Sequence, residues 1–244
     1  MYFNDVHILW YFLTILIGGI VGQATDYISK SFIDEKKILS KVNIKEYLRV
    51  CIPNYILIFT TATLYTALLY VFGTTKLIDF IRFAILIPML IIAFIVDYKI
   101  QIIPNRLNLT MFEVGLVFTF ILGITNINMA TNLLLGMLAG GGIFLVIALL
   151  GGLIAGKEAM GFGDVKLMGA LGLFFGLNST ILISVLAFLL GAIIGIILII
   201  TKKNKANNYI PFGPFIVIAT IITIFVPFNV LFTILMKIFS LGLY

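Results

Sequence analysis

Long apolar segments separated by short polar ones recur from one end of the chain to the other. A helix needs about 20 apolar residues to cross the hydrocarbon core of a bilayer, and most of these segments approach or reach that length. Because lipid leaves backbone polar groups to be satisfied within the segment, continuous apolar runs predict helices. The pattern lacks the alternating segments of about 10 residues that are typical of outer-membrane barrels. The predicted spans are residues 6–24, 54–72, 80–97, 106–124, 130–155, 165–177, 179–201 and 211–226.

This pattern predicts an all-α, polytopic integral membrane protein with about eight transmembrane helices. A further apolar segment, residues 228–243, is interrupted by Lys237 and either crosses the membrane or lies along its surface. The only sizeable polar stretch, residues 25–53, is too short for an independent domain, so we expect a single membrane-embedded domain over residues 1–244. Within that stretch, residues 35–49 fit either an interfacial helix or a solvated loop.

The composition agrees with a membrane protein. Of the 244 residues, 62% are hydrophobic and only 11% are charged, which is more apolar than a water-soluble core of this size requires. Cys51 is the only cysteine, which excludes intrachain disulfides and four-cysteine zinc sites. The first apolar segment has no basic residue before it and no small-residue cleavage signature after it. We therefore expect a retained span and not a removed signal peptide.

The net charge of +6 could suggest a nucleic-acid partner, but the positions of the basic residues indicate membrane topology instead. Thirteen of the sixteen Lys and Arg residues fall in alternate loops, which the positive-inside rule assigns to the cytoplasm. This predicts an N-terminus outside the cell. The thirteen residues assigned to the cytoplasm are Lys30, Lys36, Lys37, Lys41, Lys45, Arg49, Lys99, Arg106, Lys157, Lys166, Lys202, Lys203 and Lys205. The three on the other side are Lys76, Arg82 and Lys237.

Asp164 stands between two long apolar segments, and Gly161 and Gly163 precede it. An ionisable group at such a position is costly, which makes it a candidate functional residue. The glycines allow positive φ or a close approach to another segment, and the dipole of the helix that follows favours an ionised carboxylate. The alternative is that Asp164 simply caps this helix, an ordinary use of aspartate.

Asp97 ends the predicted span 80–97 and is followed by a short irregular connection before Pro104 restarts a helix. Proline is tolerated in a first helical turn, and it disfavours helical geometry in the residue before it. The alternative for Asp97 is a boundary charge paired with Lys99 or Arg106.

The predicted topology places Asp97 and Asp164 at the same cytoplasmic boundary. Two carboxylates close together in a partly dry site cannot both ionise easily, so they share a proton. The ionised one can activate water while the protonated one polarises a peptide carbonyl, which is the combination that peptide hydrolysis needs. Other chemistries lack parts, because His7 is the only histidine and lies on the opposite side, and Cys51 has no histidine nearby. A zinc site would lack its ligands.

Two further residues are candidates for contacting a substrate. Glu113 lies within a predicted span, where an acid is costly and usually faces a cavity or a partner. It either makes a structural hydrogen bond, to Asn108 or to a neighbouring helix, or contacts the substrate. Lys166 follows Asp164 closely.

Glycines are frequent in the first and fifth spans. In the first span, Gly18, Gly19 and Gly22 favour close helix packing over a catalytic role. In the fifth span, the glycines indicate either tight helix contact or a mobile helix.

Three motifs resemble the prepilin peptidases, the type IV prepilin-like leader peptidases with a GxGD motif. They are Asp97 followed by Ile-Pro-Asn at 103–105, MGFGDVKLMGALGLFFG at 160–176, and IPFGPF at 210–215. The resemblance implies a membrane aspartic protease of the bacterial inner membrane that removes the basic leader of type IV prepilins or pseudopilins at the cytoplasmic face. Asp97 and Asp164 would be catalytic, and Gly161 and Gly163 would place Asp164.

The resemblance also raises the question of a second activity. Many members methylate the new N-terminus with S-adenosylmethionine and carry a larger first loop with two cysteine pairs that resembles a zinc site. Here the loop at 25–53 is short and holds only Cys51, so we expect no metal, and methylation stays open. An ion-coupled transporter or channel is the main alternative function, and a non-catalytic pilus-assembly protein is the second. Transport sites, however, lie near the bilayer midplane.

Overall fold

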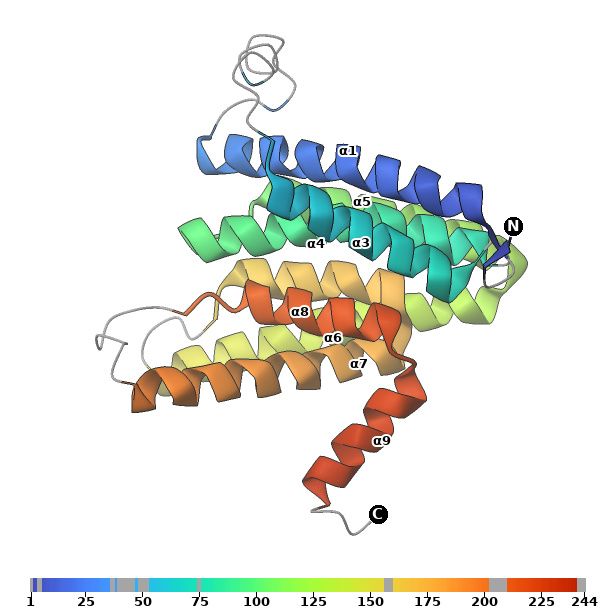
Figure 1. The fold of residues 1–244 in the computed structure, drawn as a ribbon. Coiled ribbons are helices and arrows are strands. Elements are labelled where there is room, and N and C mark those ends of the chain that lie inside the picture. Colours follow the sequence, from blue (N-terminus) through green and yellow to red (C-terminus); the bar gives the residue numbers. More distant parts are fainter. Residues whose placement is uncertain are drawn as a thin grey trace. The chain divides into compact units, whose positions relative to one another are not determined.

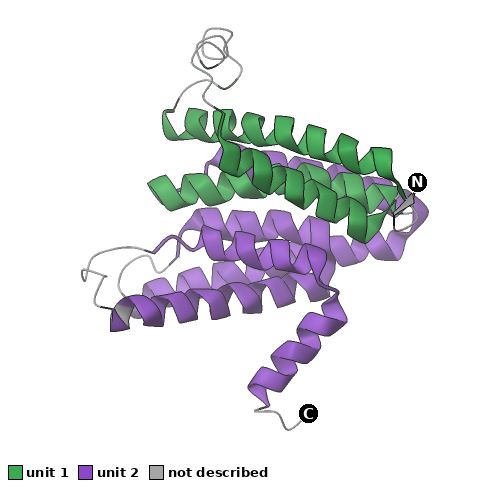
Figure 2. Ribbon diagram, in the orientation of Figure 1, with its two compact units in different colours: residues 1–100 green, residues 101–244 purple. Residues whose placement is uncertain are grey.

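The structure is a computed structural model that describes residues 2–3, 6–35, 38, 47, 53–73, 76–155, 160–201 and 210–240. It is almost entirely helical, as predicted; its only strands in the described ranges are β1 (Tyr2–Phe3) and β2 (Val6–His7), which pair antiparallel. Six of the described helices are long and apolar enough to cross a membrane, which indicates a multi-pass membrane protein. The chain divides into two compact units, residues 1–100 and 101–244 (Figure 2). This division does not test the expectation of a single membrane-embedded domain, which stays a prediction.

The described part of unit 1 contains the N-terminal hairpin and the helices α1 (Ile8–Ile33), α3 (Tyr55–Phe72) and α4 (Leu77–Ile100) (Figure 1). Glycines bring α1 against α3: a Cβ on Gly18 would lie 2.7 Å from the Cα of Ala62. At the same contact the Thr61 hydroxyl lies 2.6 Å from the carbonyl oxygen of Gly18. The close helix packing predicted for Gly18 is thereby confirmed.

The helix α1 is longer than the predicted span 6–24, since it continues to Ile33. The expectation that residues 25–33 form a loop is therefore wrong. Several of these residues are polar, and their side chains bond both within the helix and to Asn54, which precedes α3. The hydroxyl of Ser29 lies 2.7 Å from the Thr25 carbonyl oxygen, and Lys30 pairs with Asp26 one turn earlier.

Unit 2 contains α5 (Asn105–Thr125), α6 (Ile127–Ala155), α7 (Phe162–Ile200), α8 (Gly213–Phe225) and α9 (Phe228–Phe239). The long α7 is broken at Gly176, whose φ of 74° and ψ of 177° are not helical. Glycine tolerates this conformation because it has no Cβ. Figure 1 shows the chain turning back there, so the two halves of α7 run in opposite directions. This break lies close to the predicted boundary between spans 165–177 and 179–201.

Both halves of α7 pack against the same glycine-rich helix, α6. A Cβ on Gly136 would contact Gly172 in the first half and Gly176 at the break. The side-chain oxygen of Asn132 accepts a hydrogen bond of 3.2 Å from the Leu177 backbone N–H, which caps the second half. Of the two alternatives for the glycines of this span, tight helix contact is the one observed.

The predicted count of eight spans is not confirmed. The segment predicted at 211–226 forms α8, which has only 13 residues, and about 20 are needed to cross a bilayer. The segment at 228–243 forms α9, with 12 residues. Phe212 at the start of α8 packs against Phe144 of α6 and Phe188 of α7, with ring centroids 5.9 and 5.1 Å apart. The IPFGPF motif thus anchors α8 to its neighbours.

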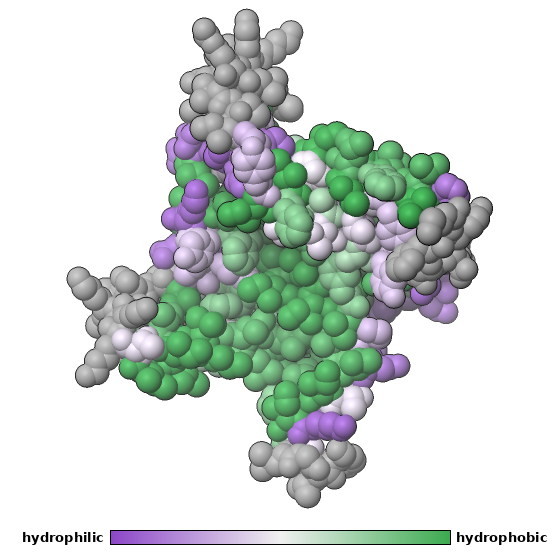
Figure 3. Space-filling view, viewed as in Figure 1, coloured by the Kyte–Doolittle hydropathy of each residue, from purple (hydrophilic) through white to green (hydrophobic). Residues whose placement is uncertain are grey.

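The outer sides of the helices are apolar. Phe59 on α3 exposes 74% of its surface and Ile154 on α6 exposes 87%, and large exposed apolar surfaces are typical of contact with lipid. Figure 3 shows hydrophobic side chains covering the helices of unit 2. Of residues 35–49, the structure describes only Glu35, Ile38 and Tyr47. The choice between an interfacial helix and a solvated loop therefore lies outside the described residues.

Candidate active site

Asp97 lies in the last turn of α4, three residues before the helix ends at Ile100. Only 4% of its surface is exposed, whereas its neighbours Tyr98 and Lys99 are exposed. A boundary charge of the ordinary kind is solvated, and a buried carboxylate is costly unless it is compensated. The burial of Asp97 therefore fits a functional carboxylate better than a surface charge.

Asp164 lies in the first turn of α7 and is 5% exposed. Its backbone N–H donates a hydrogen bond of 3.1 Å to the carbonyl oxygen of Gly161. Since the helix begins at Phe162, Asp164 is inside the first turn and is not the capping residue. The positive end of the helix dipole lies at this turn and stabilises negative charge.

Neither glycine of the motif has an unusual backbone conformation, and Gly163 serves close approach. The described glycines with positive φ are Gly73 and Gly176, so the alternative of positive φ at Gly161 and Gly163 is wrong. A Cβ on Gly163 would lie 3.2 Å from the Cβ of Ile103. Gly163 therefore lets the start of α7 lie against the residues that precede α5.

Two hydrogen bonds join the start of α5 to the start of α7. The side-chain amide of Asn108, which is 3% exposed, donates to the carbonyl oxygen of Gly163 at 3.0 Å. The ammonium group of Lys166 donates to the side-chain oxygen of Asn105 at 2.7 Å and lies 5.2 Å from the centroid of the Phe162 ring. The segments on either side of Asp164 are thus held by α5.

Glu113 does not form the hydrogen bond to Asn108 that was considered from the sequence. It is exposed, and the Asn108 amide is directed at Gly163. The two residues are five apart on one helix, which places them about 140° apart around its axis. Lys166 is also exposed. The role of Glu113 and Lys166 as substrate contacts stays a prediction.

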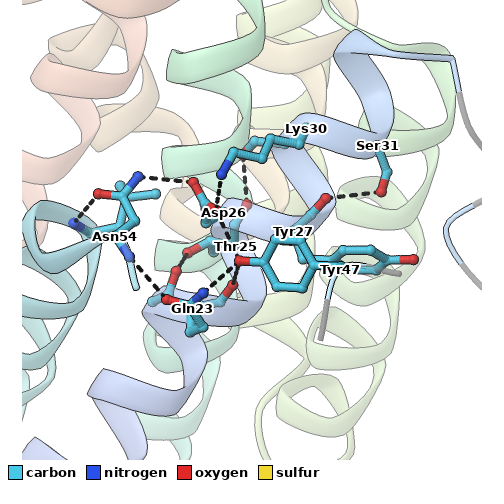
Figure 4. Close-up of polar contacts among 11 residues, drawn as sticks. Gln23, Thr25, Asp26, Tyr27, Lys30, Ser31, Tyr47 and Asn54 are labelled. Carbon is cyan, nitrogen blue, oxygen red and sulfur yellow. Dashed lines mark hydrogen bonds and ion pairs between the residues drawn. The ribbon is translucent and has the colours of Figure 1, made fainter. Parts of the chain in front are cut away.

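A polar cluster around the buried carboxylate of Asp26 was not identified as a site from the sequence (Figure 4). One oxygen of Asp26 accepts from the Asn54 amide at 2.8 Å. The other accepts from the Tyr47 hydroxyl at 2.9 Å and pairs with Lys30 at 2.6 Å. Asn54 precedes α3 and also caps it.

Gln23 completes this cluster. Its side-chain nitrogen lies 2.6 Å from the Tyr47 hydroxyl oxygen, and its side-chain oxygen accepts from the Asn54 backbone N–H at 3.2 Å. Because Asp26 is 4% exposed and both its oxygens are engaged, it is not available to attract a basic leader peptide. Asp34 and Glu35 are exposed.

Within the described ranges, no group of three or more His, Cys, Asp or Glu residues is arranged to hold a metal ion. Asp97 belongs to unit 1 and Asp164 to unit 2. The chemistry of these two carboxylates together is therefore a matter of proposal.

Comparison with known proteins decides which family the motifs point to. The model of the type IV leader peptidase family matches residues 84–196, a range that contains both Asp97 and Asp164. The resemblance to prepilin peptidases is confirmed. The match to this family and the apolar helices together indicate a multi-pass protein of the inner membrane.

Individual relatives of this peptidase family carry one description, "Prepilin leader peptidase/N-methyltransferase". The chain is 33% identical to that of Aeromonas hydrophila over 124 residues, which are 51% of this chain and 42% of the relative. It is 31% identical to that of Legionella pneumophila over 147 residues, 59% of this chain and 49% of the relative. For Pseudomonas aeruginosa the identity is 42% over 67 residues, 28% of this chain and 23% of the relative.

The matched stretch thus spans less than half the length of these curated relatives. No solved structure matches the chain.

Proposed function

We propose that the chain is a membrane aspartic endopeptidase that removes the basic leader from type IV prepilins or pseudopilins at the cytoplasmic face of the membrane. Asp97 and Asp164 would form the general acid and base. The observation that carries the proposal is that both carboxylates are nearly fully buried at the ends of apolar helices, within the stretch matched by the leader peptidase family. An acid in that setting is expensive and marks a functional site.

The two carboxylates would share one proton, because two of them in a partly dry site do not both ionise easily. The ionised one would take a proton from water as the water attacks the scissile carbonyl. The protonated one would donate its proton to the carbonyl oxygen, which gives a neutral tetrahedral diol. Collapse of the diol with a proton returned to the leaving nitrogen releases the leader.

The form of the substrate fits a multi-pass membrane protein. A prepilin is an apolar helix preceded by a basic leader, so its helix can lie in lipid while the leader reaches the cytoplasmic boundary. Exposed Asp34 and Glu35, just after α1, are acidic groups that could attract the leader. Such exposed charges act over about 8 Å at physiological ionic strength, so they would raise the rate of encounter more than the affinity.

N-methylation of the mature N-terminus is a separate proposal, based on the names of the relatives. The methyl donor would be S-adenosylmethionine, whose amino group needs an acceptor such as a carboxylate. The Asp26 carboxylate is already bonded to Lys30, Tyr47 and Asn54. This cluster therefore does not fit the cofactor as it stands, and proteolysis needs none.

The experiment is co-expression of a type IV prepilin with the wild type, Asp97→Asn or Asp164→Asn, followed by the mobility shift of leader removal. We expect the wild type to process the prepilin and each variant to abolish processing at equal abundance in the membrane. Asp79→Asn is the matched control, because it makes the same change at the other end of α4. Full processing by either active-site variant would contradict the acid–base pair.

The same samples separate the other functions. An ion-coupled transporter or a non-catalytic assembly protein would leave the prepilin unprocessed by the wild type as well. Mass spectrometry of the mature N-terminus tests the methyltransferase, since methylation adds about 14 Da to the first residue. An unmodified N-terminus on processed pilin would leave the peptidase proposal intact and contradict methylation.

A further inference from the structure

We propose that Asn108 is a positioning residue for Asp164, acting through the backbone carbonyl of Gly163. The proposal rests on the peptidase function above, because it gives Asn108 a part in that reaction. Asn108 touches neither water nor substrate in this role. It would fix the peptide unit that leads into Asp164, so that the carboxylate stays at one angle to the scissile bond.

The contact itself is direct and buried. The Nδ2 atom of Asn108 lies 3.0 Å from the Gly163 carbonyl oxygen, and Asn108 is 3% exposed. A carbonyl oxygen can only accept, so the amide group must present its nitrogen here and not its oxygen. The bond spans 55 residues of sequence and ends on the residue immediately before Asp164.

The stability of the folded protein does not by itself explain why residue 108 is an asparagine. Among the described residues, its Oδ1 atom is buried without a hydrogen-bond partner. A buried amide that satisfies only one of its two polar ends is less favourable than an apolar side chain of the same shape, which buries no polar atom. The amide therefore needs another reason for being there, and a directed bond to the start of the Asp164 helix supplies one.

Two weaker contacts hold the same turn but cannot direct it as well. Ile103 lies against Gly163 through an apolar contact, which resists approach but does not fix orientation. Lys166 bonds Asn105 at an exposed position, and exposed charged contacts are weak and mobile. Of these three contacts, the hydrogen bond from Asn108 is the one that is both buried and directional.

The chain offers a matched control on the same two helices. The hydroxyl of Thr119 on α5 lies 2.9 Å from the Gly115 carbonyl oxygen of its own helix and 3.5 Å from the Leu173 carbonyl oxygen of α7. Thr119 is 5% exposed, so Thr119→Val also removes a buried polar contact between α5 and α7. Its contact lies nine residues beyond Asp164 along α7, well away from the proposed reaction.

The experiment measures prepilin cleavage by purified protein in lipid nanodiscs for the wild type, Asn108→Leu, Asn108→Gln and Thr119→Val. Misplacing a catalytic group by about 1 Å can lower the rate about 100-fold. We therefore expect kcat of Asn108→Leu to fall about 10- to 100-fold with KM within about twofold of wild type. Asn108→Gln keeps the amide donor and should recover part of kcat. Thr119→Val should keep kcat within about threefold, the change expected of a residue outside the reaction.

A second measurement does not depend on activity. Hydrogen–deuterium exchange over residues 160–166 should be faster in Asn108→Leu than in the wild type, and unchanged in Thr119→Val. If the wild type fails to cleave any prepilin, the peptidase proposal falls, and the exchange result still decides whether Asn108 holds this turn.

Three outcomes would overturn the role of Asn108. They are wild-type kcat in Asn108→Leu, an equal loss of kcat in Asn108→Leu and Thr119→Val, and unchanged exchange over residues 160–166. If Asn108→Leu cannot be isolated folded, Asn108→Ala carries the same comparison, because it also removes the amide donor to Gly163. An Asn108→Ala enzyme with wild-type kcat and exchange would then count against the proposal.

Discussion

Gly136 on α6 and Gly172 on α7 lie so close that a Cβ built on Gly136 would come within 2.6 Å of the Gly172 carbonyl oxygen. Backbone stands against backbone at this point, so neither side can yield by moving a side chain. The contact joins α6 to the first half of α7, the half that carries Asp164 in its first turn. The position of the candidate catalytic helix thus depends on two residues without side chains.

A side chain at this contact should separate the two helices. We expect Gly172→Val to lower the free energy of unfolding by about 1–3 kcal/mol or more, because overpacked side chains force the backbone to shift. The control is Gly142→Ala on the facing helix α6, where a Cβ would meet nothing within 4 Å. Alanine there should stabilise by about 0.5–1 kcal/mol, as expected for glycine replaced inside a helix. Thermal unfolding in detergent measures both, and equal effects would contradict the close contact.

The Asp26 cluster should contribute to stability and not to cleavage chemistry. Replacing Asp26 with Asn puts an uncharged amide beside the Tyr47 hydroxyl and Lys30, so one or more of the donors to this buried side chain lose their acceptor. We expect a loss of about 1–3 kcal/mol, the usual penalty for an unsatisfied buried polar group. Lys30→Met should lose less, at most about 1 kcal/mol, because the Lys30 side chain is 53% exposed.

A double-mutant cycle checks this assignment. Asp26→Asn combined with Asn54→Ala should lose less than the sum of the two single changes, since both remove the same 2.8 Å hydrogen bond. Chemical unfolding of the four proteins gives the coupling energy. Additive losses would mean that the bond between Asp26 and Asn54 contributes nothing to the folded state.

The sequence predicts the helices well and their polar ends poorly. Continuous apolar runs identify membrane spans because length and composition alone decide whether a segment can cross lipid. The turn at Gly176 could also be located to within a few residues, from the predicted boundary between two spans. The end of α1 could not, since residues 25–33 are polar and their helix is supported by Asn54, 28 residues beyond Asp26.

In the candidate site, too, the sequence predicts some residues and gives no signal for others. Asp97 and Asp164 stand out in the sequence because an acid beside an apolar span is costly, and both are buried in the structure. Asn108 does not stand out, since an asparagine near a helix start is ordinary and its partner is a backbone oxygen 55 residues away. A bond to a backbone carbonyl leaves no residue type at the other end to recognise, so the sequence offers no signal for it.

The predicted orientation can be tested with single cysteines in a Cys51→Ser background. Lys76 and Thr201 are both exposed and lie on opposite sides of the membrane if the positive-inside rule holds. A membrane-impermeant maleimide should label Lys76→Cys in intact spheroplasts and Thr201→Cys only after the membrane is opened. Labelling of Thr201→Cys in intact spheroplasts would reverse the orientation and place the proposed site outside the cytoplasm.

Thr61 provides the last test, of how α1 and α3 are held together. Its hydroxyl lies 2.6 Å from the Gly18 carbonyl oxygen of α1 and 2.7 Å from the Leu57 carbonyl oxygen of its own helix. Thr61→Val keeps the shape of the side chain and removes the only donor between the two backbones at this point. Hydrogen bonds between membrane helices contribute about 0.6 kcal/mol on average and at most about 1.7 kcal/mol, and full burial of Thr61 favours the upper part of that range.

Thr63→Val is the matched control, because Thr63 is exposed on the same helix and its hydroxyl bonds only the Phe59 carbonyl oxygen of α3. That bond does not join two helices, so its loss should change the free energy of unfolding by less than about 0.5 kcal/mol. The difference between the two variants isolates the contact with Gly18. If Thr61→Val were no less stable than Thr63→Val, the bond from Thr61 to Gly18 would contribute nothing to the α1–α3 contact, and the close approach at Gly18 and Gly22 would hold the helices together at this point. Substituting either glycine should then separate them there.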